Sequence, residues 1–195
     1  MKKQSMKSKS RIFAAVAAAL FAAAAPAGAA VLHYALDAAH SRLEFTGTQA
    51  GAPFTALFQH FTATIAFAPT DLADSRFDVV IEVASADSKD KDRDGAMRGT
   101  DIFDVARFPT AEYVTRAFAK TGAGFTATGT LSLRGVARTV PIAFTFTPTP
   151  GGAILRGTAK LERLDFGVGQ GQWKNTTWIG NDVGIAFSLS LKPMP

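Results

Sequence analysis

Residues 183–191 read Val-Gly-Ile-Ala-Phe-Ser-Leu-Ser-Leu, so that large apolar side chains alternate with small ones without a break. Strict alternation predicts a β-strand with one face buried and the other face wet or half-wet. Residues 140–147 repeat the pattern, with an apolar row that runs from Val140 to Phe146. The other segments with strand character are 31–37, 42–46, 61–67, 77–83, 111–120, 125–133 and 155–161.

Turn signals separate these segments. Arg134-Gly135 lies between two of them, and Pro150-Gly151-Gly152 precedes another. Residues 85–106 are charged and then carry apolar side chains at loosely helical spacing between Met97 and Val105, which predicts a loop and a short helix. Many strands joined by tight turns indicate an antiparallel sandwich or barrel.

The composition bounds the class of protein. A chain of 195 residues is long enough for one domain, and 47% hydrophobic residues exclude a disordered chain. The absence of cysteine excludes disulfides, thiolate nucleophiles and cysteine-bound metals. The net charge of +5 comes from five basic residues among the first eleven, so it gives no argument for nucleic acid as a partner.

Residues 1–29 have the pattern of a secretory signal peptide. A basic segment precedes the apolar run 12–25, and Ala27-Gly28-Ala29 supplies the small residues of a cleavage site. This apolar run is too short for a transmembrane helix, which needs about 20 apolar residues to cross a bilayer. We therefore expect cleavage after Ala29, a mature domain of residues 30–195 and a periplasmic location.

The apolar strand faces are rich in phenylalanine. Fourteen of the 16 Phe lie beyond the leader, whereas the chain has only two Tyr and two Trp. Phe supplies large apolar area without a polar group. A barrel of about eight strands is either filled by its own side chains or holds one small ligand. Periodicity alone therefore leaves a packed core and an apolar ligand cavity both open.

An ordered set of short motifs spans Tyr34 to Leu191. The motifs are Tyr34-x-x-Asp37, His40-Ser41-x-Leu43-x-Phe45, Phe58-x-x-Phe61, Arg93-Asp94-x-x-Met97, Asp101-x-Phe103-Asp104, Phe108-Pro109-x-Ala111, Gly129-x-Leu131-x-Leu133-Arg134-Gly135, Arg163-x-Asp165-Phe166-Gly167-Val168-Gly169 and Asp182-Val183. Together they resemble the YceI family of bacterial secreted proteins. The stretches 48–51 and 171–173 are similar to a subgroup whose members are sometimes joined to cytochrome b561-type membrane domains.

The chain departs from the commonest family pattern at three positions. Gln49 stands where many members have His, Ala56 where many have Gly, and Ile102 where the subgroup often has Trp. We expect these changes to alter one cavity wall and to leave the fold unchanged.

The resemblance implies an all-β fold, an eight-stranded antiparallel, extended, lipocalin-like barrel with one or two short helices. It also implies a periplasmic protein that sequesters or transports a polyisoprenoid or similar amphiphile, such as an isoprenoid quinone, a prenyl pyrophosphate or a fatty amide. Two alternatives are an enzyme acting on such a lipid and an accessory protein that delivers quinone to a cytochrome b561-type partner. A second copy of the chain is a further candidate partner. Because the parity assignment places no titratable group among the inward positions, we expect no enzymatic activity. We expect a bound lipid and no cofactor.

Strand parity and the resemblance together select the residues expected to contact lipid. They are Phe45, Phe54, Phe58, Phe61, Ile65, Phe67, Phe77, Val79, Ile81, Phe103, Phe144 and Phe187. Trp173 and Trp178 flank a polar segment and are candidates for the barrel rim or for packing at a sheet edge. Arg134, Arg138 and Arg163 are either solvated or turn-stabilising arginines, or contacts for an anionic head group.

The sequence carries no convincing catalytic or metal-binding motif. His33, His40 and His60 do not share metal-ligand spacing, and the chain has no Gly-x-Ser-x-Gly nucleophile motif. Asp90, Asp92, Asp94 and Asp101 have the spacing of carboxylates in an EF-hand calcium loop. Interleaved basic residues and a preceding strand argue against calcium there, so a charged loop and the first turn of a short helix are favoured.

Overall fold

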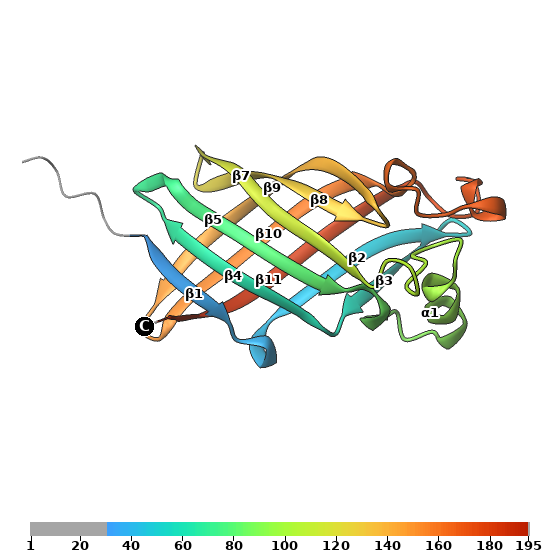
Figure 1. Ribbon diagram of the computed structural model, residues 1–195, viewed down its shortest axis with the longest axis horizontal. Helices are drawn as coiled ribbons and strands as arrows, with labels where there is room; N and C mark the ends of the chain where they lie inside the picture. Colours follow the sequence, from blue (N-terminus) through green and yellow to red (C-terminus); the bar gives the residue numbers. More distant parts are fainter. Residues whose placement is uncertain (1–30, 195) are drawn as a thin grey trace, which may run out of the picture.

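The computed structural model describes residues 31–194, which form an elongated antiparallel β-barrel (Figure 1). The strands are β1 (Leu32–Leu36), β2 (Arg42–Gln49), β3 (Ala52–Phe58), β4 (Phe61–Ala68), β5 (Asp71–Glu82), β6 (Ala86–Asp87), β7 (Thr110–Thr121), β8 (Gly124–Leu133), β9 (Val136–Thr149), β10 (Gly152–Glu162) and β11 (Asp182–Pro193). One α-helix, α1 (Lys91–Arg98), and short 3-10 turns complete the described chain. None of its helices is long and apolar enough to cross a membrane.

Eight strands close the barrel in the order β1-β4-β5-β7-β8-β9-β10-β11, and β11 pairs again with β1. The strands β2, β3 and β6 continue the sheet from β11 beyond this closure. Both β1 and β2 pair with β11: β1 joins its last residues, Leu191 to Pro193, and β2 joins Gly184 to Ser188. The expected eight-stranded antiparallel barrel is confirmed, and the sandwich is excluded.

The period of two places side chains as the sequence predicts. Along β9, Val140 and Phe144 are buried, while Thr145 is exposed. The turn at Arg134-Gly135 has both residues at positive φ, 51° and 75°, which is the geometry of a tight hairpin. The 3-10 turn Ala38–His40 joins β1 to β2.

Two sequence expectations need correction. The segment Ala52–Phe58 is a strand that we did not predict, because Pro53 and an irregular apolar pattern conceal it. The helix in 85–106 exists but ends at Arg98, so Ile102, Phe103 and Val105 lie in turns. Its N-cap is Asp90, whose carboxylate accepts hydrogen bonds from the backbone N–H groups of Asp92 and Arg93.

The two ends of the barrel differ in how they are filled. At the end that holds β1 and the C-terminus, six phenylalanines pack together, a group that we call the aromatic plug: Phe67, Phe77, Phe118, Phe125, Phe144 and Phe146. The ring centroid of Phe67 lies 4.9–5.8 Å from those of the other five. A second apolar cluster, which includes Met97 of α1 and Phe103, occupies the opposite end. The barrel interior is therefore apolar at both ends and holds its tightest group of aromatic rings at the end next to β1.

Candidate functional site

A cavity of about 420 Å³ occupies the half of the barrel next to α1. It runs from Ile65, Phe77, Leu155 and Leu189 in the interior to a group of polar and aromatic residues at the α1 end. We call that end the mouth, defined by Gln49, Asp90, Asp92, Arg93 and Trp173. Asp90 and Asp92 are exposed, so the cavity reaches solvent there.

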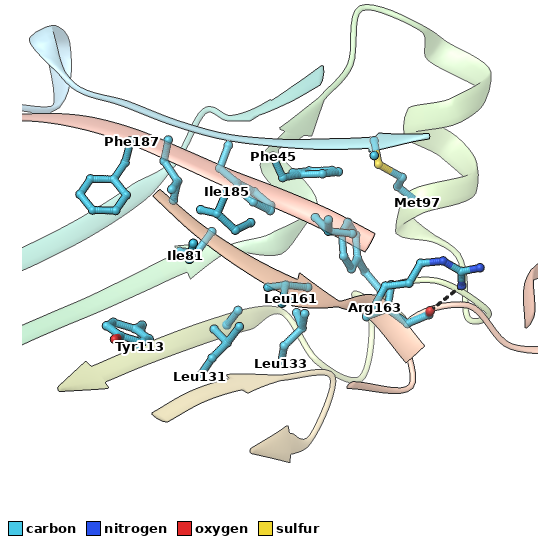
Figure 2. A pocket seen from close by; sticks show the side chains of 18 of the residues that line it. Phe45, Ile81, Met97, Tyr113, Leu131, Leu133, Leu161, Arg163, Ile185 and Phe187 are labelled. Carbon is cyan, nitrogen blue, oxygen red and sulfur yellow. Dashed lines mark hydrogen bonds between the residues drawn. The ribbon is translucent and has the colours of Figure 1, made fainter. Parts of the chain in front are cut away.

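The wall is built from apolar residues on alternate positions of several strands. Figure 2 shows side chains such as Ile81, Leu131 and Ile185 pointing into one space from different strands. In the same view Phe187 lies at one end of the row and Arg163 at the other. Because a large apolar wall encloses the space, it suits an apolar guest such as a hydrocarbon chain.

Ten of the twelve residues expected to contact lipid line this cavity. They are Phe45, Phe54, Phe58, Phe61, Ile65, Phe77, Val79, Ile81, Phe103 and Phe187. The other two, Phe67 and Phe144, also point into the barrel but are buried in the aromatic plug, beyond the inner end of the cavity. The alternation along a strand identifies which side chains point into the barrel. It does not show which of those side chains pack against each other and which line a cavity.

Several lining residues were not among those twelve. They include Leu131, Leu133, Leu155, Leu161, Ile185 and Tyr113. The first five stand on the same period-two rows as the chosen residues, so parity alone could have included them. Tyr113 lies on β7, where the register shifts between Thr115 and Ala117 and weakens the pattern.

A polar network stands at the mouth. Arg93 Nε donates to Gln49 Oε1 at 2.9 Å, and its guanidinium carbon lies 4.5 Å from the centroid of the Phe54 ring. Arg93 Nη2 lies 3.4 Å from Asp90 Oδ2. Hydrogen bonding from the backbone N–H of Arg93 lowers the pKa of Asp90. Gln49, one of the three departures from the family pattern, thus holds an arginine over an aromatic ring at the entrance.

The subgroup-like stretch 48–51 is hydrogen-bonded to the loop that follows the stretch 171–173. The β2–β3 turn donates from Ala50 N to Trp178 O at 2.7 Å, and Gly180 N donates to Thr48 O at 2.9 Å. Trp173 lines the mouth, whereas Trp178 is 54% exposed. Both tryptophans therefore lie at the rim of the barrel.

Arg163 fixes the loop between β10 and β11. Its Nε, Nη1 and Nη2 atoms donate to the carbonyls of Gly180, Val168 and Ile179 at 2.8–2.9 Å. Within residues 31–194 no carboxylate forms a salt bridge with it, and burial lowers the pKa of its guanidinium. Its role here is therefore to hold the loop.

The other two candidate arginines lie outside the cavity. Arg134 donates from Nη2 to Thr100 O at 2.7 Å, and Arg138 donates to Ala137 O at 3.1 Å. Arg134 therefore ties two loops together and Arg138 bonds within its own strand. Of the two roles that the sequence left open, these contacts fit the structural one and not the head-group contact.

The titratable residues are not gathered in the interior. Contrary to the sequence expectation, one titratable side chain on a strand, that of Tyr113, points inward and lines the cavity; its hydroxyl donates to Val140 O at 2.9 Å. Burial raises the pKa of Tyr113 well above its usual range. His40 and His60 bind Asp37 and Glu82 at the surface, at 3.0 and 3.3 Å.

The carboxylates of the calcium-like motif are held apart by other partners. Asp90 caps α1, and Asp94 Oδ1 accepts from Ser88 N at 2.8 Å and Ser88 Oγ at 2.7 Å. Across residues 31–194 there is no group of three or more His, Asp or Glu side chains placed to hold a metal ion.

An extended antiparallel barrel with an apolar cavity and a polar mouth defines a lipocalin-like class of protein. Residues 34–191 match the YceI-like domain, and the chain belongs to the YceI family. A UPF0312 protein of Vibrio parahaemolyticus is 31% identical over 157 residues, covering 75% of this chain and 83% of that protein. A UPF0312 protein of Azotobacter vinelandii is 35% identical over 118 residues, covering 57% and 62%.

Solved structures share the fold. The crystal structure of BcnA from Burkholderia cenocepacia matches with a TM-score of 0.76 and 32% identity, covering 79% of this chain and 98% of BcnA. A polyisoprenoid-binding domain from Saccharophagus degradans matches with a TM-score of 0.62 and 18% identity, covering 84% and 99%. At 18% identity, the likeness to the Saccharophagus degradans domain concerns the fold alone.

Proposed function

We propose that this protein binds the hydrocarbon tail of a polyisoprenoid or similar long-chain amphiphile and sequesters or transports it. The observation that carries the proposal is the apolar cavity of about 420 Å³ that reaches solvent at one end. The YceI relationship and the neighbour described as a polyisoprenoid-binding domain support the lipid class. Each CH₂ group that leaves water contributes about 0.8 kcal/mol, so a tail of modest length binds well after its ordering costs.

The polar groups of the mouth suit the head group of such a lipid. Gln49, Arg93 and Trp173 stand where a tail would leave the cavity, and they offer amide, guanidinium and aromatic surfaces. A tail inside and a head group outside would keep the lipid dissolved without modifying it.

Binding without bond-making fits the chemistry of the wall better than catalysis does. General acid–base catalysis needs a titratable group within hydrogen-bond reach of the reacting atom. Among the described lining residues the carboxylates stand at the mouth, and the hydroxyl of Tyr113 is engaged with a backbone carbonyl.

The proposal includes export. The signal peptide expected at residues 1–29 lies outside the described residues, and its pattern supports a periplasmic protein. Sequencing of the N-terminus of protein recovered from the periplasm should give a chain that begins at Ala30. An unprocessed N-terminus in the cytoplasmic fraction would contradict this part of the proposal.

The binding test uses protein purified from its own host, with organic extraction and mass spectrometry of the extract. We expect a co-purified lipid with a long apolar chain, or uptake of an added prenyl alcohol by the stripped protein. If the extract contains no stoichiometric lipid and the stripped protein takes up no prenyl alcohol, the proposal is overturned.

A matched pair of variants on β10 locates the binding. Leu161 lines the cavity, and its neighbour Lys160 is exposed. Leu161→Trp should fill the hollow and weaken prenyl alcohol binding at least about tenfold, since each 1.4 kcal/mol of lost contact is a factor of ten. Lys160→Trp should leave binding unchanged. Equal effects of the two would show that the lipid binds elsewhere.

A further inference from the structure

We infer that the inner end of the cavity, formed by the aromatic plug together with Phe187, sets the length of the tail that this protein accommodates, at about three to four isoprene units. The inference rests on the proposed function and names its ligand more closely. A cavity of about 150 Å³ holds one benzene molecule of six carbons. On that scale the 420 Å³ cavity holds roughly 17 carbons, which lies between three and four five-carbon units.

The inner end of the cavity is closed by rings that support one another. Phe77 lines the cavity with its ring centroid 4.8 Å from that of Phe118 and 5.1 Å from that of Phe144. Phe67 lies behind them, 1% exposed and in contact with every other ring of the plug. Since packed aromatic side chains leave no passage for an alkyl chain, a tail cannot thread further along the barrel.

Phe187 forms the other part of this inner end. Its side chain stands at the end of the lining row opposite Arg163 (Figure 2). Unlike Phe67 and Phe144 it is only partly buried, and it is not one of the six rings of the plug. Removal of its ring therefore lengthens the cavity with less damage to the core than removal of a plug residue.

A tail longer than the cavity must leave its remaining carbons at the mouth. These carbons stay in water and add little to the affinity. Affinity should therefore rise with tail length, by roughly tenfold or more for each isoprene unit, until the cavity is full, and then level off.

The test measures dissociation constants for a series of prenyl alcohols from two to eight isoprene units, by displacement of a fluorescent prenyl probe. For the unmodified protein we expect the break in the series between three and four units. Affinity that still rises from four to eight units would overturn the inference while leaving the proposed function intact. Absence of binding at every length would overturn both.

Variants show whether the inner end is responsible. Phe187→Ala removes about the volume of one benzene ring, so the break should move to longer tails by about one unit. Phe187→Leu removes less volume and should move it less. The control is Phe108→Ala, which removes a partly buried ring that packs against Gly135 outside the cavity and should leave the break in place. An unmoved break in a folded Phe187 variant would overturn the inference.

Discussion

The ring of Phe187 on β11 occupies the space that a side chain on Gly157 of β10 would fill. The two residues face each other in the ladder between these strands. A β-carbon on Gly157 would collide with the Cζ atom of Phe187, and it would lie 2.6 Å from the carbonyl oxygen of Ala143 on β9. Glycine at this position thus lets a large ring lie against the barrel wall at the inner end of the cavity.

Gly157→Ala should therefore destabilise the protein by about 1–3 kcal/mol, the usual cost of overpacking. Gly184→Ala is the matched control, because nothing lies within 4 Å of a β-carbon there and its φ is not in the left-handed region. The control should be neutral or slightly stabilising. Denaturant unfolding measures both free energies. A similar loss in the two variants would show that the strands merely need glycine for flexibility.

The barrel interior should reject charge at every inward position. Phe144 is 4% exposed within the aromatic plug, and its neighbour Thr145 faces solvent. Phe144→Asp should cost more than about 3 kcal/mol or abolish folding, because it buries a carboxylate without a partner. Thr145→Asp should cost less than about 1 kcal/mol. Circular dichroism during thermal unfolding distinguishes them, and equal damage at both positions would show that the assigned faces are wrong.

The loop that carries Trp173 should depend on Arg163. Arg163→Met removes three hydrogen bonds and leaves buried carbonyl groups without donors, which should cost about 2 kcal/mol or more. Amide hydrogen exchange should speed up in residues 164–181 before it does elsewhere. Arg156→Met, on the exposed face of β10, is the control and should change neither quantity. Unchanged exchange in the loop of the Arg163 variant would contradict the role given to this side chain.

Acid should weaken the junction between β1 and β11. Asp37 Oδ2 lies 2.9 Å from Lys192 Nζ and 3.0 Å from His40 Nδ1, and these hydrogen bonds lower the pKa of Asp37. A depressed carboxyl pKa adds stability above the unfolded value of about 3.9, and this stability is lost as pH falls through the folded value.

The stability difference between the unmodified protein and Asp37→Asn should therefore be complete near neutral pH and shrink below about pH 4. Asp87 and Asp90 also have lowered pKa values, so both proteins lose stability in acid, and only the difference reports on Asp37. Melting temperatures across the acid range measure it. A difference that stays constant with pH would exclude the ion pair as its source.

Local alternation was sufficient to predict the strands and their faces. The row from Val183 to Leu191 points into the barrel along its whole length, as the sequence indicates. The hairpin at Arg134-Gly135 was equally visible, because Gly135 suits the positive φ that a tight turn needs, although Arg134 also has a positive φ. β3 was hidden because its apolar residues do not alternate strictly.

The division of the interior into plug and cavity was not visible in the sequence. Phe67 and Phe187 are both inward phenylalanines of alternating rows in the sequence, yet only Phe187 lines the hollow. Which rings meet depends on how far each strand is shifted against its neighbour, and two irregularities, at 66–68 in β4 and at 115–117 in β7, alter that shift. The role of Arg163 was hidden for a similar reason, since two of its partners, Ile179 and Gly180, come from the far end of the loop.

The seam between β1 and β11 joins the first and the last strands to leave the ribosome, with Leu36 opposite Leu191. A nascent chain that ends before Leu191 lacks the residues of β11 that pair with β1, so the barrel cannot close until those residues have been synthesised. Contacts so distant in sequence form late in folding, because the whole intervening chain must first be brought together. The barrel can therefore close only after β11 has been synthesised, although the hairpins between neighbouring strands can form earlier.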